Sequence, residues 1–245
     1  MKYAIIAAGE GSRLLQEGIG APKPLVKVRQ EHLIDRLIRI FVACGASEIA
    51  VICRPTADYP APTGQPLLLV SDHLRELQQR LSVPLHIISK ATPSSMHSLF
   101  ELSPLLGDAP FVLTTVDTIF REAEFSNYIS EFQRLLASDE ADGLMGVTDF
   151  IDDEKPLYVE ASADGRITSF LDACTHPHYI SGGIYGLTPR SLLTLQHCME
   201  RGESRMRNFQ RALVADGLRL RVFPFSKVLD IDHASDILKA EQFLQ

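Results

Sequence analysis

Two glycines and two cations near the start of the chain carry the clearest chemical signal. Gly9 and Gly11 follow an apolar run, and they leave the backbone free to approach a ligand with successive N–H groups aimed at one anion. Arg13 comes two residues later, and its guanidinium can fork onto phosphate oxygens. Lys23 stands between two prolines, which stiffen the backbone that carries its ammonium. Together these residues predict a site for a polyphosphate.

Aspartates later in the chain are candidates for holding a metal ion beside that polyphosphate. Asp117 ends an apolar run, which places it at the carboxyl edge of a buried strand, where ligands of parallel sheets gather. Capping of a following turn is the alternative role for Asp117. Mg²⁺ takes one or two protein carboxylates together with phosphate oxygens and waters. Asp230 and Asp232 stand two residues apart at the end of another apolar run, and we expect one of them to point into the site.

The elements that must position these residues alternate along the chain. Short apolar runs alternate with stretches of helical spacing, which predicts a mostly parallel sheet covered on both faces: a Rossmann-like, three-layer α/β/α fold. We expect strands at residues 3–8, 26–28, 48–53, 83–89, 110–117, 142–149, 157–161, 167–171, 178–186 and 218–224. Helices are expected at residues 32–44, 72–81, from 94, from about 127 to 136, at 191–201 and 208–217, and from 233 or 234 to 244. Residues 54–65 hold three prolines and predict a loop.

The composition excludes several classes of protein. A hydrophobic fraction of 45% with 22% charged residues is typical of a soluble globular chain, and a net charge of −7 argues against nucleic acid as a partner. The four cysteines form no Cys-x-x-Cys pair, so we expect reduced thiols in a cytoplasmic protein. The apolar run before Gly9 is too short for a signal peptide, and no run is long enough for a membrane helix. The sequence leaves a homo-oligomer open.

The opening pattern resembles the signature of the nucleotidyltransferases that make nucleotide sugars and related activated head groups, a family that also includes the molybdenum-cofactor nucleotidyltransferases. In that family the glycine loop wraps a triphosphate, the arginine holds it and the lysine touches the phosphate under attack. The resemblance therefore implies catalytic roles for Arg13 and Lys23. The match falls on Ala7, Ala8, Gly9, Gly11, Arg13, Leu14, Pro22 and Lys23, and the implied nucleotide-binding loop also includes Glu10 and Ser12.

The same resemblance implies the metal and base sites. Asp117 matches the family aspartate that holds Mg²⁺, and Asp232 matches the second metal ligand, with Asp230 as the fallback. Where relatives carry a Gly-Thr-Ala-like segment beside the base, this chain has Ser94 and Ser95, so the identity of the base does not carry over. Ser94 could equally cap the helix that starts there, and nearby His97 is expected to be a packed or capping residue.

The acceptor half matches the family less well. Residues 178–186 resemble its acceptor-binding strand, which implies acceptor contacts from Thr118, Ser181, Gly182 and Gly183; a β-bulge or tight packing is the alternative for the glycines. Relatives carry a Glu-Lys pair after the hairpin, but residues 172–174 hold no lysine. The cations that could replace it are Lys155, Arg205 and Arg207. The acidic run at 149–154 could hold a second metal, although a solvated loop is the more usual interpretation.

These patterns predict one nucleotidyltransferase domain over residues 1–245, with a nucleotide half at about 1–119 and an acceptor half at about 120–245. Nucleoside monophosphate would pass from a triphosphate to a phosphorylated acceptor, most simply a sugar 1-phosphate. A dehydrogenase would need a small residue at Leu14 and an acid at Arg54. A glycosyltransferase of similar topology would carry Asp-x-Asp where this chain reads Thr115-Val116-Asp117. A silent nucleotide sensor is the remaining alternative.

Overall fold

A nine-stranded sheet forms the centre of the computed structural model, which describes residues 1–55, 69–151 and 155–245. Its first half is entirely parallel. Strand β1 (Lys2–Ala7) lies in the middle of this half, so the loop that follows it opens at the centre of the sheet's carboxyl edge. The strand order across this half is β6 (Phe111–Thr115), β1, β4 (Glu48–Cys53) and β5 (Leu85–Ser89).

Strand β11 (Tyr179–Leu187) joins the second half of the sheet to the first, because it pairs antiparallel with β6. On its other side β11 pairs with β8 (Gly143–Thr148), which is parallel to β12 (Leu220–Phe225). The predicted hairpin is present as β9 (Tyr158–Ala161) and β10 (Ile167–Leu171), and β9 also pairs with β11. The predicted α/β fold with a mostly parallel central sheet is confirmed.

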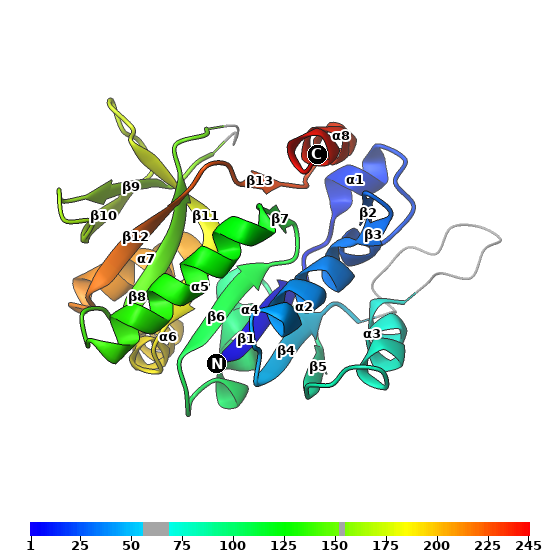
Figure 1. The fold of residues 1–245 in the computed structure, drawn as a ribbon, viewed down its shortest axis with the longest axis horizontal. Helices are drawn as coiled ribbons and strands as arrows, with labels where there is room; N and C mark the ends of the chain where they lie inside the picture. Colours follow the sequence, from blue (N-terminus) through cyan, green and yellow to red (C-terminus); the bar gives the residue numbers. More distant parts are fainter. Residues whose placement is uncertain (56–68, 152–154) are drawn as a thin grey trace.

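Helices cover both faces of the sheet (Figure 1). Helices α2 (Leu33–Ala43) and α5 (Glu122–Ala137) lie on one face. The other face carries α4 (Ser95–Leu102), α6 (Arg190–Glu200) and α7 (Met206–Ala215). Helix α5 starts five residues before the predicted Asn127, because Phe125 of its first turns is fully buried and Glu122 stabilises the positive N-terminus. None of the described helices is both long and apolar enough to cross a membrane.

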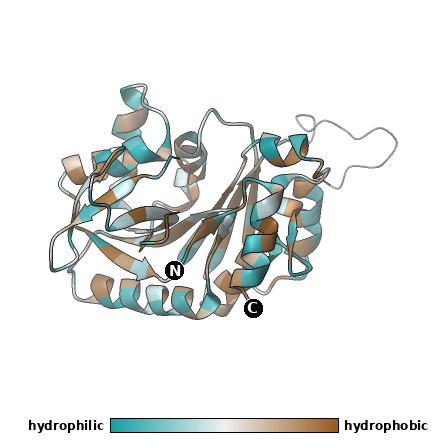
Figure 2. Cartoon of the chain, turned by 90° about the horizontal axis from the view of Figure 1, so that it is seen from above, coloured by the Kyte–Doolittle hydropathy of each residue, from teal (hydrophilic) through white to brown (hydrophobic). Residues whose placement is uncertain are grey.

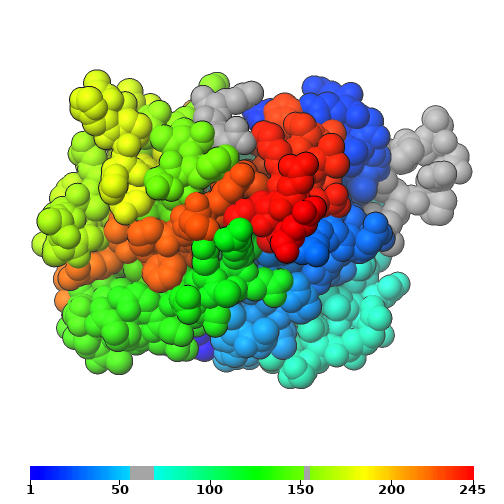
Figure 3. Space-filling model, turned by 45° about the horizontal axis from the view of Figure 1, so that its top comes forward, coloured from blue at the N-terminus to red at the C-terminus, as the bar shows by residue number. Residues whose placement is uncertain are grey.

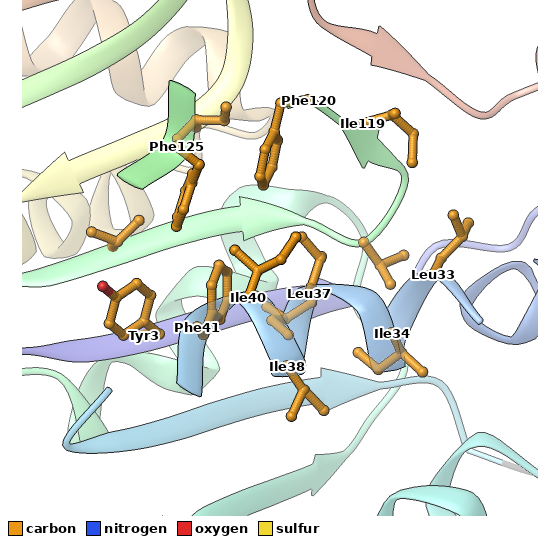
Figure 4. Packing of buried hydrophobic residues seen from close by; sticks show 14 of the residues in the cluster. Tyr3, Leu33, Ile34, Leu37, Ile38, Ile40, Phe41, Ile119, Phe120 and Phe125 are labelled. Atoms are coloured by element: carbon orange, nitrogen blue, oxygen red, sulfur yellow. The ribbon is translucent and has the colours of Figure 1, made fainter. Parts of the chain in front are cut away.

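Strand β1 shows how the two cores form. Its side chains alternate between faces, so Tyr3 packs on one side with Phe41 of α2, at a ring-centroid distance of 4.6 Å (Figure 4). Ala4 belongs instead to the core on the opposite face, together with Leu99 of α4. Hydrophobic residues therefore run through the middle of the molecule between two helical layers (Figure 2). Burial on both faces fixes the register of β1 and hence the position of the loop after it.

The C-terminal helix contacts an early segment of the chain at the surface. Helix α8 (Ala234–Phe243) lies beside α1 (Ser12–Gln16), as the adjoining red and blue atoms show (Figure 3). Glu17 accepts hydrogen bonds from the backbone N–H of Ala234 at 2.6 Å and pairs with the His233 ring at 2.6 Å. This contact brings residues near 232 to the glycine loop. The rest of the chain includes α3 (Val70–Gln78).

Residues 56–65 of the predicted loop and residues 152–154 of the acidic run lie outside the described residues.

Candidate active site

A cavity of about 610 Å³ opens at the carboxyl end of β1. Its walls come from the glycine loop, from the start of α4 and from the end of β6, three places that the parallel topology brings to one edge. Asp117 and Asp232, the predicted metal ligands, also line it. All the predicted nucleotide-binding residues line this cavity, namely Ala7, Ala8, Gly9, Glu10, Gly11, Ser12, Arg13, Lys23, Ser94 and Ser95.

The glycine loop has a conformation that depends on its glycines. Gly11 has a φ of +61°, which side chains rarely tolerate, and it forms the N-cap of α1. A Cβ atom at Gly11 would lie 3.0 Å from the Cβ of Lys23. A Cβ at Gly9 would meet nothing within 4 Å, so this glycine faces open space. The loop is therefore packed against Lys23 on one side and open on the cavity side.

Lys23 lies at the centre of the site. It begins the short 3₁₀ turn η1 (Lys23–Leu25), after Pro22 in an extended conformation, and its side chain is only 10% exposed. Its Nζ donates hydrogen bonds to Asp117 Oδ2 and, at 2.7 Å, to Asp232 Oδ1. Burial alone would lower the pKa of Lys23, but the two carboxylates outweigh burial and raise it. One ammonium thus holds two carboxylates at a single point.

The charge of Asp117 follows from the same contacts. Burial favours its neutral form, but the Lys23 charge and a hydrogen bond with Thr115 outweigh burial, and the pKa of Asp117 is lowered. Asp117 is therefore a carboxylate at neutral pH. An ionised carboxylate in a polar cavity is a suitable ligand for a hard cation such as Mg²⁺.

Asp232 is hydrogen-bonded to Lys23, to Arg13 and to Asp236. Its Oδ2 accepts a hydrogen bond from Arg13 at 3.0 Å. Its backbone N–H donates to Asp236 Oδ2 at 3.2 Å, in the first turn of α8, where negative charge is favourable. The hydrogen bond between Glu17 and His233 lowers the pKa of the Glu17 carboxyl and raises the pKa of the His233 ring. The helix start therefore positions Asp232, and Asp236 caps it by accepting the backbone N–H of His233 at 2.8 Å.

Asp230 and Asp232 have different surroundings in the structure. Asp230 lies on β13 (Leu229–Asp230), opposite Thr118 of β7 (Thr118–Ile119), and the next residue, Ile231, donates to the carbonyl of Asp117 at 3.1 Å. Asp230 lines a second cavity, of about 310 Å³, that shares Arg13 and Asp232 with the first. Asp232 is thus the aspartate that shares Lys23 with Asp117, and its role as a metal ligand stays a prediction.

The first half of the chain matches a known protein family. A family model for the MobA-like NTP transferase domain matches residues 3–149, which is more than half of the chain. The chain belongs to this family. The matched span contains the glycine loop, Lys23 and Asp117, whereas Asp232 lies beyond it. Membership identifies the chain as a nucleotidyltransferase, as the opening motif predicted.

Solved structures extend the likeness of this family member to its whole length. An inositol-1-phosphate CTP transferase from T. maritima superposes with a TM-score of 0.73 at 17% identity, covering 100% of this chain and 97% of that chain. A Bacillus anthracis protein assigned as a glucose-1-phosphate thymidylyltransferase, in complex with sucrose, gives 0.80 at 18%, with 99% and 94% covered. A CTP:phosphocholine cytidylyltransferase from Streptococcus pneumoniae gives 0.73 at 18%, with 100% and 99% covered. These similarities establish a common fold.

Two of the four residues predicted to contact the acceptor line the second cavity, namely Ser181 and Gly182. Thr118 is fully buried and hydrogen-bonded to Thr115 at 2.6 Å, and Gly183 has a φ of +70° with its missing Cβ 3.0 Å from Thr118 Oγ1. The β11–β8 register shifts here, so the predicted bulge is present. Contact of Thr118 or Gly183 with an acceptor stays a prediction that this geometry does not support.

The serines at the start of α4 have partners of their own. Ser94 is at the N-cap as predicted, but its hydroxyl bonds with the His97 ring at 2.8 Å instead of capping a backbone N–H. The same hydroxyl accepts the Arg205 N–H at 3.1 Å, which ties α7 to the cavity wall. His97 therefore has the packing role expected of it.

Sequence reasoning missed several residues of the cavity wall. Arg54 follows β4, the strand next to β1, and donates to Glu10 of the glycine loop at 3.2 Å. Arg54 could have been predicted from its place at the carboxyl end of a parallel strand, because ligands gather there and Asp117 was selected for the same reason. Thr92 and Ser98 also line the cavity and bond to one another at 2.6 Å.

The proposed replacements for the missing lysine lie near one another. Arg207 donates to Asp172 at 2.5 Å and to the Lys155 carbonyl at 3.1 Å. Arg211 pairs with the other oxygen of Asp172 at 2.7 Å. Hydrogen bonds from Arg211 and Arg207 lower the pKa of Asp172. Arg205 has a φ of +73°, an uncommon conformation for a residue other than glycine.

Proposed function

We propose that this nucleotidyltransferase moves a nucleoside monophosphate from a triphosphate to a phosphorylated small molecule, with a sugar 1-phosphate as the best-fitting acceptor. The observation that carries the proposal is the ammonium of Lys23 between Asp117 and Asp232, beside a glycine loop and within one cavity. Structures of the same fold are named for inositol 1-phosphate, glucose 1-phosphate and phosphocholine as acceptors, all of them phosphomonoesters.

In this reaction a phosphate oxygen of the acceptor attacks the α-phosphorus of the triphosphate. The bond between the α-phosphorus and the bridging oxygen breaks, and pyrophosphate leaves with the electron pair. Positioning and charge neutralisation supply most of the catalysis in such transfers. Backbone amides of residues 9–12 and the guanidinium of Arg13 would hold the β- and γ-phosphates. Lys23 would stabilise the charge that builds on the α-phosphate.

We also propose a requirement for Mg²⁺. Asp117 and Asp232 fit such an ion, because both carboxylates converge on one cation, Lys23 Nζ, at the wall of the cavity. These two residues would hold the ion, which would neutralise charge on the α-phosphate. Lys23 now donates hydrogen bonds to both carboxylates, and Arg13 donates one to Asp232. Their cationic groups therefore stand where they can exchange carboxylate partners for phosphate oxygens.

The second cavity supplies a place for the acceptor. It shares Arg13 and Asp232 with the nucleotide cavity, so an acceptor phosphate there would lie beside the predicted metal ligands. This arrangement supports a nucleotide half at about residues 1–119 and an acceptor half at about 120–245 within one domain. We place the reaction in the cytoplasm, where the four free cysteines would stay reduced.

A matrix of four triphosphates against a panel of phosphomonoesters tests the proposal. The panel contains glucose 1-phosphate, inositol 1-phosphate and phosphocholine, and pyrophosphate release is measured with Mg²⁺ and after chelation. We expect release with one preferred pair, lost on chelation and in Asp117→Asn. Triphosphate binding without release from any pair would favour the silent sensor. Consumption of a nucleotide sugar, with no pyrophosphate formed, would favour the glycosyltransferase.

A further inference from the structure

Two histidines and an aspartate form a cluster outside the active site. His32 precedes α2, Asp35 lies in the first turn of α2, and His73 lies in the first turns of α3. The ligand atoms that these three side chains offer all lie within 4.8 Å of one another. None of the three lines the nucleotide or the acceptor cavity. The mechanism above therefore does not use them.

The local fold brings the three side chains together. Residues three apart at a helix start share one face, so His32 and Asp35 are neighbours. Helix α3 supplies the third member, with His73 Nε2 at 2.6 Å from Asp35 Oδ1 and the two imidazole rings 5.2 Å apart, edge to face. The three residues are partly exposed, which leaves the cluster open to a solvated ion.

A hydrogen bond of His32 prepares its ring for a metal. Its Nδ1 lies 2.7 Å from the carbonyl oxygen of Leu25, and a carbonyl can only accept, so Nδ1 carries the proton and donates it. Nε2 is then the nitrogen with a free lone pair. Metal-binding histidines usually have this arrangement, in which the second ring nitrogen donates to a carbonyl or carboxylate and fixes the tautomer.

We propose that His32, Asp35 and His73 form a binding site for a divalent first-row transition-metal ion such as Zn²⁺. Two imidazoles select such ions over Mg²⁺ and Ca²⁺, which prefer oxygen ligands. Two histidines, one carboxylate and a water complete a tetrahedral site. Bonds of ~2.0–2.1 Å place tetrahedral ligands roughly 3.3 Å apart, so binding needs only a small inward rotation of the side chains. To bind through Nε2, the neutral His73 ring changes tautomer: its Nε2 proton passes to water and its Nδ1 takes up a proton from water, so that Nε2 gains a free lone pair.

The ion would join three segments. It would bind α2 and α3 directly, and through His32 it would reach the Leu25 carbonyl, two residues after Lys23. The site is therefore a structural one, which holds the catalytic lysine turn to the helices behind it.

Isothermal titration of the chelator-treated full chain with Zn²⁺ tests the site, with Mg²⁺ present in excess to occupy Asp117 and Asp232. We expect one strong equivalent of zinc, with affinity weakened at least about 100-fold in His32→Gln and His73→Gln, since loss of a second-shell partner alone costs about 10–100-fold. His86→Gln is the matched control, because His86 also pairs through Nε2 with a carboxylate, that of Glu48 at 2.9 Å. This variant and Asp117→Asn should bind zinc like the wild type.

Thermal unfolding gives a second measurement. Zinc should raise the melting temperature of the wild type and of His86→Gln, but not that of His73→Gln, since an ion that binds only the folded state stabilises it. If a histidine variant does not fold, Asp35→Asn replaces it in both measurements. Absence of zinc binding by the wild type, or unchanged binding in a folded His73→Gln variant, would overturn the proposal. Loss of the zinc equivalent in Asp117→Asn would reassign it to the active site.

Discussion

Gly11 and Lys23 are packed against each other, with only 3.0 Å between the Lys23 Cβ and the position that a Cβ would take at Gly11. The glycine loop and Lys23 are therefore one structural unit, although Gly11 and Lys23 are twelve positions apart in the sequence. The glycine at position 11 is required twice, once for its positive φ and once for this contact.

Gly11→Ala should lower both stability and turnover. An alanine at positive φ costs about 1–2 kcal/mol, and the added methyl group would displace Lys23 from its carboxylates. Gly18→Ala is the matched control, because Gly18 has a φ of +88° but no atom within 4 Å of its missing Cβ. Denaturant unfolding should show similar losses in both variants, whereas pyrophosphate release should fall only in Gly11→Ala. Equal turnover in the two variants would show that the contact with Lys23 is dispensable.

Lys23→Ala should lower turnover by roughly 10²–10³, because one preorganised charge at the transition state is worth about 3–4 kcal/mol. The side chain is 10% exposed and forms ion pairs with both carboxylates, so its removal leaves two buried or half-buried acids without this partner. Lys27→Ala, which removes an exposed lysine four residues on, should leave pyrophosphate release unchanged. Wild-type release by a folded Lys23→Ala variant would exclude Lys23 from the reaction.

Asp117 and Asp232 should act as one unit. Both bond to Lys23 Nζ, so we expect Asp117→Asn and Asp232→Asn each to abolish most activity. The double variant should be little worse than the worse single variant, because groups that serve one function are not additive. Asp230→Asn should be milder, since Asp230 lines the second cavity and is not among the described residues that line the first. An inactive Asp230→Asn beside an active Asp232→Asn would reverse the assignment.

The nucleotide side of the site could be predicted from the sequence because its determinants are local. Gly9, Gly11 and Arg13 lie within five residues, and the alternation of strands and helices places the end of β6 beside β1. The position of Asp232 was harder to predict from local sequence. Its approach to Asp117 depends on the pairing of β13 with β7 and on the hydrogen bond between Ala234 and Glu17, which are 217 residues apart. No local pattern reports a contact of that range.

The acceptor side was harder to predict, for two physical reasons. A glycine pair has the same sequence whether it faces a ligand or forms a bulge, and Gly183 does the latter beside Thr118. The cations are the second reason. Arg207 and Arg211 are four residues apart on α7 and meet Asp172 only in the folded chain, so the sequence could not show that this acid is already neutralised. Arg54 was missed although its strand end made it visible.

Asp142 should make stability depend on pH. Burial alone would raise its pKa, but hydrogen bonds from Arg219 at 2.9 and 3.1 Å and the nearby charge of Arg190 outweigh burial and lower it. A lowered pKa stabilises the fold above the unfolded value near 3.9, and this contribution disappears as the pH falls through the folded value. Asp142→Asn should therefore lose about 1–3 kcal/mol at pH 7, and the difference from wild type should shrink below about pH 4.

Denaturant unfolding between pH 7 and pH 3 measures this difference. Asp139→Asn is the matched control, because Asp139 bonds to the same Arg219 at 2.7 Å but its side chain is 90% exposed. Exposed ion pairs contribute ~0–1 kcal/mol, so this variant should follow the wild type closely at every pH. A difference for Asp142→Asn that stays constant down to pH 3 would show that its ionisation does not contribute.

The last prediction concerns the charge that holds the acceptor phosphate, for which Lys155, Arg205 and Arg207 are the candidates. Arg207 is the first to test, because it joins Asp172, where relatives carry their Glu-Lys pair, to the backbone of residue 155, although none of the three candidates is among the described residues that line the second cavity. Arg207→Ala should raise the KM for the acceptor about 10-fold or more, as expected when about 1.4 kcal/mol of binding is lost, and leave the KM for the triphosphate nearly unchanged. Lys155→Ala and Arg205→Ala complete the series. Arg134→Ala is the control, an arginine on α5 that pairs with Glu131 and Glu140. If all three candidates keep the wild-type acceptor KM, the acceptor is held by metal and backbone alone, or it is not a phosphomonoester of the expected size.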